Sequence, residues 1–374
     1  MYILAFETSC DETAVALLQA ENGLTDPQFK ILKNLVFSQI KIHQPFGGVV
    51  PMLAQREHLK NLPVLLALLL KQKPSLFNQE FIQSTIFRRL DLISVTTGPG
   101  LEPCLWTGIK FAKDLYEKIK IYNKKIKLMG VNHLAGHLYS FLLTASNKKK
   151  LKFPLVALLA SGGHTLLLLM EDLTTYKKLG ETRDDAIGEC LDKVARLLGL
   201  NYPGGPALEK LAKKGKATAI DFPRPMLKQK NYDFSFSGLK TAVLYHLKGK
   251  RKNSRLTKKE IRQIKVNKLT IQQRADIAAS FQQAAFEVLI EKTLKAVKEF
   301  KAKTILLAGG VAANKTLQTG FKKNIKKQKL TDVNLIVPAK KFCTDNAAMI
   351  AVAGYINYLQ GKKHRLIAQG NLTI

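Results

Sequence analysis

Short apolar runs recur along the chain, and a polar or glycine-containing turn follows each of them. Runs of this length between turn signals are typical of buried strands. The pattern therefore predicts strands at Met1–Phe6, Ala14–Gln19, Asp91–Thr97, Lys127–Val131, Pro154–Ala160, Leu166–Met170, Thr304–Ala308 and Asn334–Val337.

Longer segments with apolar residues three and four positions apart lie between these strands, which is the spacing of an amphipathic helix. Strands that alternate with helices predict an α/β fold with mixed sheets flanked by helices. The predicted helices with two bounds are Met52–Leu70 (one helix, or two split at Pro63), Leu105–Lys118, Asp184–Leu198 and Asp276–Phe300. Further helices are predicted directly after Asn132 and after the turns Tyr202–Pro206, Phe234–Lys240 and Gly309–Asn314. A last helix is predicted from Cys343–Asn346 to about Gln360.

One arrangement occurs twice: a strand, a small polar turn and a returning strand, at Met1–Gln19 and again at Leu155–Met170. The turns, Glu7–Thr13 and Ser161–Thr165, offer hydroxyl groups and backbone N–H groups, which can hold phosphate. The repetition predicts two lobes with a nucleotide and metal cleft between them.

A charged break at Asn147–Lys150 suggests where the lobes divide. We expect an N-terminal lobe of residues 1–148, joined by a C-terminal helix at 345–374, and a second lobe of residues 149–344. The second lobe contains a Lys-rich insertion at about 248–268, with ten Lys or Arg and one Glu. Such a segment is typical of a solvated insertion, and an RNA contact is the alternative.

The chain has 374 residues, 46% of them hydrophobic, and a net charge of +32. The length and the apolar content are typical of a globular protein with a large core. A charge of this size attracts RNA, DNA or an anionic membrane surface. However, 49 of the 60 basic residues are Lys, a skew that an A/T-rich genome imposes on any surface, so the charge permits nucleic-acid binding without proving it.

The four cysteines are scattered and form no CxxC pair, which argues against a zinc ribbon or a disulfide framework. The first residues lack the basic, apolar and small-residue order of a signal peptide, and no apolar run is long enough to cross a membrane. We therefore expect a cytoplasmic protein that does not enter a membrane.

His133 and His137 stand four residues apart on the helix that Asn132 can cap. Residues at this spacing share one helix face, so both imidazoles can reach one metal ion. Gly136 removes side-chain bulk beside them. Two surface histidines on an amphipathic helix are the alternative, because two ligands are too few for a metal site.

Asp345, at the start of the final helix, is the candidate third ligand. Two imidazoles and one carboxylate leave coordination positions open for substrate oxygens, and both iron and zinc suit this set. The alternative role for Asp345 is to cap the helix.

Several glycine turns precede helices and can bind a nucleotide, although none is a Walker A or a GxGxxG sequence. Ser161, Gly162 and Gly163 offer groups to phosphate, while Gly309 and Gly310 would let a base or ribose lie on the backbone. Asn314 can bond to either of these.

Two carboxylates are further candidates. Asp192 could bind a ribose hydroxyl or a substrate amine, or could instead pair with Lys193 or Arg196 on the surface. Glu12 lies beside the presumed first phosphate turn, where a negative charge favours a catalytic role over binding.

The motifs resemble those of the universal tRNA adenosine threonylcarbamoyltransferase family, whose fold is of the acetate kinase–Hsp70–actin (ASKHA) type. The resemblance covers nearly the whole chain in family order. The matching blocks are ETSCDETAVAL at Glu7–Leu17, GGVVPMLAQREHLKNL at Gly47–Leu62, TTGPGLEPCLWTGIKFAKDL at Thr96–Leu115, VNHLAGHLYS at Val131–Ser140, ALLASGGHTLLL at Ala157–Leu168, GECLDKVARLLGLNYPGGP at Gly188–Pro206, DFSFSGLKTAV at Asp233–Val243, DIAASFQ at Asp276–Gln282, LLAGGVAANKTL at Leu306–Leu317 and CTDNAAMIA at Cys343–Ala351.

The resemblance implies transfer of a threonylcarbamoyl group from threonylcarbamoyl-AMP to the N6 amine of the adenosine 3′ of the anticodon, position 37, in tRNAs that read codons beginning with A. AMP is released. It also implies one divalent metal ion, with Fe²⁺ favoured and Zn²⁺ possible, and two partners: a non-catalytic paralogue (TsaB) and a small P-loop ATPase (TsaE).

By the same resemblance, the metal ligands are His133, His137 and Asp345. Ala135 stands where many members carry an acid. The residues implied in adenylate binding are Leu159, Ala160, Ser161, Gly162, Gly163, Asp192, Gly205, Glu209 and Asn314.

Three other functions are weighed against this one. A small-molecule kinase or ATPase of the same fold shares the phosphate turns but needs no HxxxH pair. A zinc protease needs Glu after the first histidine, where this chain has Leu134. A non-catalytic RNA-binding scaffold would not need all three metal ligands.

Overall fold

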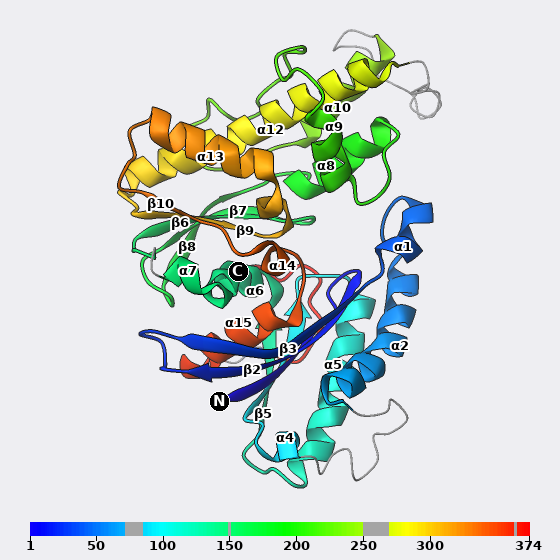
Figure 1. The fold of residues 1–374 in the computed structure, drawn as a ribbon, viewed down its shortest axis with the longest axis vertical. Coiled ribbons are helices and arrows are strands. Elements are labelled where there is room, and N and C mark those ends of the chain that lie inside the picture. The colour runs from blue at the N-terminus through cyan, green and yellow to red at the C-terminus, as the bar shows by residue number, and fades with distance from the viewer. Residues whose placement is uncertain (72–84, 149–150, 250–268, 363–364) are drawn as a thin grey trace. The chain divides into compact units, whose positions relative to one another are not determined.

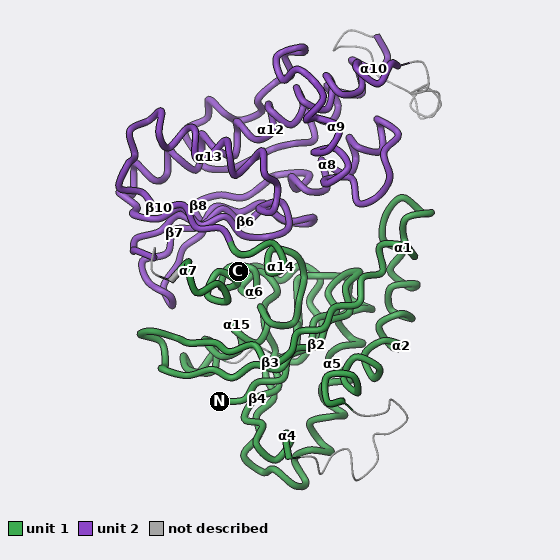
Figure 2. Tube along the Cα trace, in the orientation of Figure 1, with its two compact units in different colours: residues 1–149, 338–374 green, residues 150–337 purple. Residues whose placement is uncertain are grey.

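In the part of the chain that the structure describes, two five-stranded sheets lie one in each of two compact units (Figures 1 and 2). The computed structural model describes residues 1–71, 85–148, 151–249, 269–362 and 365–374. Unit 1 consists of residues 1–149 and 338–374, and unit 2 of residues 150–337. Most of the predicted Lys-rich insertion, residues 250–268, lies outside the described residues.

The sheet of unit 1 has the strand order β3-β2-β1-β4-β5. β1 pairs antiparallel with β2 and parallel with β4, so the sheet is mixed. The parallel strands β1, β4 and β5 all end at one edge, where a following loop or helix can carry functional side chains. The strands are β1 (Tyr2–Glu7), β2 (Glu12–Glu21), β3 (Gln28–Ser38), β4 (Leu92–Gly98) and β5 (Lys127–Asn132).

Helices bury both faces of the sheet of unit 1. Leu4 and Phe6 of β1 lie in an apolar cluster with α2 (Pro51–Leu69) and α5 (Glu102–Lys120). Ile3 and Ala5 point to the opposite face, because side chains alternate along a strand, and α15 (Ala347–Leu359) packs against β1. All four side chains are buried, which explains why β1 is a continuous apolar run.

The segment Met52–Leu70 forms one helix, α2, with Pro63 inside it, and the predicted alternative of two helices is wrong. Proline normally disrupts a helix interior. Here Leu62, Leu65 and Leu66 on both sides of it are buried, and the helix packs against β2 and α5, so tertiary packing keeps the helix continuous.

Helix covers only part of the C-terminal segment 345–374, and it ends where predicted, near Gln360. α15 ends at Leu359, and Gly361 follows in the left-handed conformation with φ +66. Gln369 then donates its backbone N–H to the carbonyl of Thr97, and Gly370 accepts from Gly100. Gly98 and Gly100 thus allow other backbone segments of the chain to approach closely. A Cβ on Gly98 would lie 2.1 Å from the Gln369 carbonyl oxygen.

Short elements complete unit 1. Its second segment begins at Pro338, earlier than the predicted boundary at 345, because Ala339 donates its backbone N–H to Thr144 and α14 packs against η2. The short elements are α1 (Ile40–His43), η1 (Gln44–Phe46), α4 (Thr85–Arg88), α6 (His133–Tyr139), η2 (Ser140–Leu143), α7 (Ala145–Lys148) and α14 (Lys340–Cys343).

Unit 2 repeats the topology of unit 1, with the strand order β10-β9-β6-β7-β8. β6 pairs antiparallel with β7 and parallel with β9, as β1 does with β2 and β4. The predicted internal repetition is therefore confirmed at the level of strand pairing. The strands are β6 (Leu155–Ala160), β7 (Thr165–Met170), β8 (Tyr176–Glu181), β9 (Thr304–Ala308) and β10 (Asn334–Ile336).

Helices cover one face of the second sheet and form its core with β6, β7 and β9. The longest, α12, starts with a capping box in which Thr270 and Gln273 bond reciprocally, and its start lies five residues before the predicted Asp276. The helices are α8 (Ile187–Leu197), α9 (Gly204–Ala212), α10 (Ser237–Lys248), α12 (Ile271–Glu299) and α13 (Lys315–Lys327), with the 3₁₀ turn η4 (Gly310–Ala313).

No helix among the described residues is both long and apolar enough to cross a membrane.

Candidate functional site

The end of β5 and the start of α15 bring the candidate metal ligands together in unit 1. β5 ends at Asn132, and α6 begins at the next residue. The Asn132 side-chain oxygen accepts hydrogen bonds from the backbone N–H groups of Leu134 and Ala135, so the predicted cap is confirmed. Its amide nitrogen donates to the carbonyl of Thr373, which fixes the orientation of the cap.

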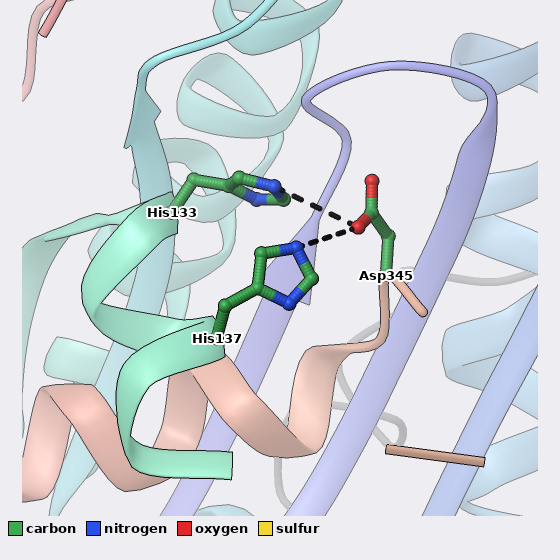
Figure 3. Close-up of side chains that lie close together, drawn as sticks. All are labelled: His133, His137 and Asp345. Carbon is green, nitrogen blue, oxygen red and sulfur yellow. Dashed lines mark ion pairs between the residues drawn. The ribbon is translucent and has the colours of Figure 1, made fainter. Parts of the chain in front are cut away.

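His133 and His137 project from one face of α6 toward Asp345 (Figure 3). The Nε2 atoms of His133 and His137 lie 3.6 Å and 3.1 Å from Asp345 Oδ1. One ligand atom from each residue lies within 4.8 Å of the others, so this group could hold a metal ion. The sequence prediction that these three side chains meet is confirmed, and the alternative of two surface histidines is wrong because both rings are buried.

The alternative role of Asp345 as a helix cap is also wrong. Asn346 caps α15, since its side-chain oxygen accepts from the backbone N–H of Met349. Gly136 packs against α15, where an added Cβ would lie 2.9 Å from Ile350 Cδ1 and 3.1 Å from Met349 Cγ. The glycine therefore brings α6 close to the helix that follows Asp345.

The donor atoms fit a metal ion better than they fit a hydrogen-bond network. Neither nitrogen of the buried His137 ring forms a well-oriented hydrogen bond among the described residues, although Nε2 lies 3.1 Å from Asp345 Oδ1. Buried polar atoms are normally bonded, so such an atom needs an explanation. A cation held jointly by His137, His133 and Asp345 would supply the missing partner for Nε2.

Glu7, at the end of β1, orients His133 from the opposite side. Its Oε2 lies 3.0 Å from His133 Nδ1 and accepts from the Thr96 hydroxyl, while its Oε1 accepts from the Ser9 N–H. Burial opposes charge on Glu7, but the interaction with His133 outweighs this and lowers the pKa of the carboxyl. In the neutral imidazole, donation of Nδ1–H to Glu7 leaves the Nε2 lone pair available on the side of Asp345, where a metal ion can take the place of the Nε2 proton.

Burial also opposes charge on His133, yet Asp345 and Glu7 raise the pKa of its imidazole to about 9. The pocket therefore favours a positive charge, which a proton or a metal ion can supply. We expect metal affinity to rise about tenfold per pH unit below pH 9 and to level off above it, because the ion must displace one proton from His133.

Calorimetric titration of the metal-free protein over about pH 7 to pH 10, in two buffers with different ionisation enthalpies, measures both the affinity and the number of protons released. An affinity that does not change with pH would contradict the expectation.

Glu12 begins β2, just after the β1–β2 turn. Burial, followed by the charges of Asp11 and Asp345, raises the pKa of its carboxyl well above the usual value. A carboxyl whose pKa is raised is a stronger base once it is ionised, as a proton acceptor in catalysis requires. Burial and the same two carboxylates, with Glu12, raise the pKa of the Cys10 thiol, so this cysteine is a poor nucleophile.

In unit 2, the predicted phosphate turn follows β6, whose last residues are Leu159 and Ala160. The Ser161 hydroxyl accepts from the His164 N–H, and the carbonyl of Ser161 accepts from Gly188 at the start of α8. An added Cβ on Gly162 or Gly163 would meet no atom within 4 Å. A ligand could therefore approach their backbone closely.

Asp192 and Gly205 are brought together: Asp192 Oδ1 accepts from the backbone N–H groups of Gly204 and Gly205, which open α9. This carboxylate thus caps a helix, and Lys193 bonds to Asp185 and Glu189. These bonds do not pair Asp192 with Lys193, and the alternative pair of Asp192 with Arg196 stays a prediction.

Glu209 and Asn314 meet at the start of α13. Glu209 Oε1 accepts from the backbone N–H of Lys315, and the Asn314 oxygen accepts from that of Leu317. The Asn314 amide nitrogen lies 3.4 Å from Gln282 Oε1. Both side chains therefore bond to protein groups here, and the neighbouring Gly310 has open space above its backbone.

Comparison with known proteins gives a match to the family model of tRNA N6-adenosine threonylcarbamoyltransferase over residues 30–352. A protein of that name from Thermosipho melanesiensis is 47% identical over 95% of this chain and 94% of its own length. Another from Anoxybacillus flavithermus is 43% identical over 100% of this chain and 97% of its own length.

Solved structures of HypF share the fold at low identity. Full-length HypF in its phosphate- and nucleotide-bound form has a TM-score of 0.53 at 12% identity, covering 96% of this chain and 55% of that one. HypF from T. kodakarensis has a TM-score of 0.51 at 16% identity, covering 76% of this chain and 44% of that one. This chain thus spans about half the length of either HypF structure.

The predicted ASKHA-type fold is confirmed, and the names of the relatives support the transferase over the small-molecule kinase. The match covers most of the chain and the relatives align over nearly their full length, so the chain belongs to the tRNA N6-adenosine threonylcarbamoyltransferase family.

Proposed function

We propose that His133, His137 and Asp345 bind a divalent metal ion that this threonylcarbamoyltransferase needs for catalysis. The observation that carries the proposal is the His137 ring, which is buried beside the other two side chains and forms no well-oriented hydrogen bond among the described residues. Two imidazoles and one carboxylate suit Fe²⁺, which we favour, and also Zn²⁺. A metal ion bound here supplies a Lewis acid for the carbamoyl carbonyl of threonylcarbamoyl-AMP.

The residues around the metal ligands have separate roles in the proposal. Glu7 holds His133 in the tautomer that leaves Nε2 available, through the contact at Nδ1. Glu12, with its raised pKa, accepts the proton that the N6 amine of adenosine 37 loses on attack, and AMP leaves. An aromatic amine is a weak nucleophile, so we expect activation of the carbonyl to contribute more to the rate than Glu12.

For the adenylate, we propose contacts from the loops at the ends of β6 and β9 and from the start of α9. Ligands of open α/β sheets bind beyond the carboxyl ends of the strands. Gly162, Gly163 and Gly205 have open space over their backbones, as close approach of phosphate or ribose requires. The full set of proposed contacts is Leu159, Ala160, Ser161, Gly162, Gly163, Asp192, Gly205, Glu209 and Asn314.

We further propose that the enzyme works in the cytoplasm with the non-catalytic paralogue TsaB and the ATPase TsaE. The support is the family membership, since a tRNA-modifying enzyme acts where its substrate is. The test is an assay with the synthase that makes the adenylate, ATP, threonine, bicarbonate and unmodified tRNA, with and without these partners. Modified tRNA must appear only with added metal; undiminished transfer in a chelator would contradict the proposed role of the ion.

We expect tRNA binding to weaken steeply with salt, because the net charge of +32 favours release of counterions from the tRNA backbone. Raising the salt from about 50 to 200 mM should lower the affinity by about 1,000-fold or more if six or more phosphates are neutralised. Filter binding or fluorescence anisotropy with unmodified tRNA measures this. An oligonucleotide with an uncharged backbone is the control. If the affinity for tRNA does not change with salt, the many lysines reflect only the composition of an A/T-rich genome.

A further inference from the structure

We propose that His58 is a positioning residue for the β1–β2 turn, which it holds through a hydrogen bond to the Cys10 carbonyl. The turn comprises Thr8–Asp11 and lies between Glu7 and Glu12. His58 lies in α2, is fully buried, and has no part in the chemistry proposed above. This inference rests on the proposed role of Glu12 as proton acceptor.

Both ring nitrogens of His58 are bonded. Nε2 lies 2.9 Å from the carbonyl oxygen of Cys10, and Nδ1 lies 2.8 Å from the Thr13 hydroxyl. The Gln39 side-chain nitrogen lies 3.4 Å from Nδ1 as well. The contacts with Cys10 and Thr13 tie α2 to both ends of the Cys10–Thr13 segment, so the ring spans the segment that contains Glu12.

The direction of these bonds follows from groups that can act in only one way. The Cys10 carbonyl can only accept, so Nε2 of His58 carries the proton and Nδ1 accepts. The same reasoning applies to His43, which bonds to Gln39. The Val50 N–H donates to Nδ1 of His43, so Nε2 of His43 carries the proton and donates to the Gln39 side-chain oxygen 3.0 Å away. The Gln39 amide nitrogen is then turned toward His58 Nδ1.

Burial lowers the pKa of both imidazoles, which agrees with neutral rings that have one donor and one acceptor each. A buried chain of polar groups in which every member is bonded fixes its members in one arrangement. The residues of this chain, Thr13, Gln39, His43 and His58, are all buried. Among the described residues of this chain of polar groups, His58 is the one whose side chain bonds to a carbonyl of the turn.

Side-chain bonds of Thr8 and Ser9 hold the start of the turn, backbone bonds hold the Ser9 and Asp11 carbonyls, and His58 adds a side-chain contact at Cys10. Leu101 donates its N–H to the Ser9 carbonyl, and Gln39 donates its N–H to the Asp11 carbonyl. Cys10 lies between these two attachment points. Loss of the His58 bond would leave the Cys10 carbonyl, next to Asp11, without its side-chain partner.

Two substitutions separate this role from a general structural one. His58→Gln keeps an N–H near the position of Nε2 and can still donate to Cys10, whereas His58→Asn keeps a polar group near Nδ1 and loses that donor. Leu66→Ala, at another buried position of α2, is the control for loss of stability alone.

We expect His58→Asn to lower kcat by about 100-fold, the loss that a misplacement of about 1 Å can cause, with KM for tRNA unchanged. His58→Gln should recover most of that loss, and Leu66→Ala should leave kcat near wild type below its unfolding temperature. Metal affinity should be the same in all three variants. An equal loss in both His58 variants, a greater loss in His58→Gln, or a loss in His58→Asn that Leu66→Ala reproduces would overturn the proposal.

Hydrogen exchange gives a second readout that needs no enzymatic activity. The amide hydrogens of Gln39 and Leu101 donate to the turn carbonyls of Asp11 and Ser9, so they report its order. They should exchange faster in His58→Asn than in His58→Gln. If the wild type transfers no threonylcarbamoyl group, the proposed function fails, but the hydrogen exchange still tests whether His58 orders the turn. Equal exchange rates in the two variants would overturn this positioning role.

Discussion

His137→Ala is expected to abolish metal binding and to reduce threonylcarbamoyl transfer to below about 1% of wild type, because replacement even of a group that only supports a metal ligand costs about 10–100-fold in affinity or activity. His137 is the ligand whose removal disturbs the protein least. Neither of its ring nitrogens forms a well-oriented hydrogen bond with a described residue, so the substitution removes only the close contact between Nε2 and Asp345 Oδ1.

His133→Ala should give the same loss of activity but a less stable protein. It removes the partner of the buried Glu7 carboxylate, and breaking a buried pair from one side costs about 3–5 kcal/mol. The two variants should therefore lose the metal alike and differ in their denaturant midpoints. Metal content, transfer rate and urea unfolding measure these quantities.

An exposed histidine provides the matched control for both variants. His246, on α10 in unit 2, should tolerate replacement by Ala with full metal content and full transfer. A His137→Ala protein that still modified tRNA at the wild-type rate would show that the buried histidines have only a structural role.

Much of the fold could be predicted because its strands are buried on both faces and are therefore unbroken apolar runs. β1, β6 and β9 are of this kind. β3 and β8 were missed, since they lie at the edges of their sheets and alternate apolar residues with lysines such as Lys30, Lys33 and Lys177. A half-exposed edge strand has little hydrophobic signal to separate it from a loop.

The metal ligands could be predicted in part for a similar reason. The spacing of His133 and His137 reports a helix face, but local sequence could not decide between ligand and cap for Asp345. The structure decides it by giving the cap to Asn346. Asp345 and the two histidines are far apart in the sequence, and only the packing of α6 on α15 through Gly136 brings them together.

Glu7 and His58 were missed as functional residues because their partners are distant in sequence. Glu7 contacts His133, and His58 contacts Cys10. In the sequence Glu7 begins the polar turn Glu7–Thr13, and His58 ends the polar stretch Gln55–His58, so neither residue differs visibly from its polar neighbours. No local periodicity marks a side chain whose role is to orient another, so such residues emerge only when the strand ends and helices are assembled.

Glu7→Gln is expected to lower metal affinity by about 10–100-fold, the usual loss when the group that orients a metal-binding histidine is replaced. The carboxylate accepts at both oxygens, from Ser9 and Thr96, and its Oε2 also fixes Nδ1–H of His133. A Gln side chain whose NH₂ group faces Nδ1 would stabilise the other tautomer. His133 Nε2 would then carry the proton and could no longer bind a metal ion.

The experiment compares metal affinity, by competition with a chelator, in wild type, Glu7→Gln and Glu21→Gln. Glu21 is an exposed carboxylate at the far end of the β1–β2 hairpin, so its replacement removes a charge without reaching His133. Nitrogen-15 chemical shifts of His133 in the metal-free proteins report the protonated nitrogen directly. If Glu7→Gln binds metal as tightly as Glu21→Gln does, the orientation of His133 by Glu7 does not control the site, and the helix cap at Asn132 must be sufficient to position the ligand.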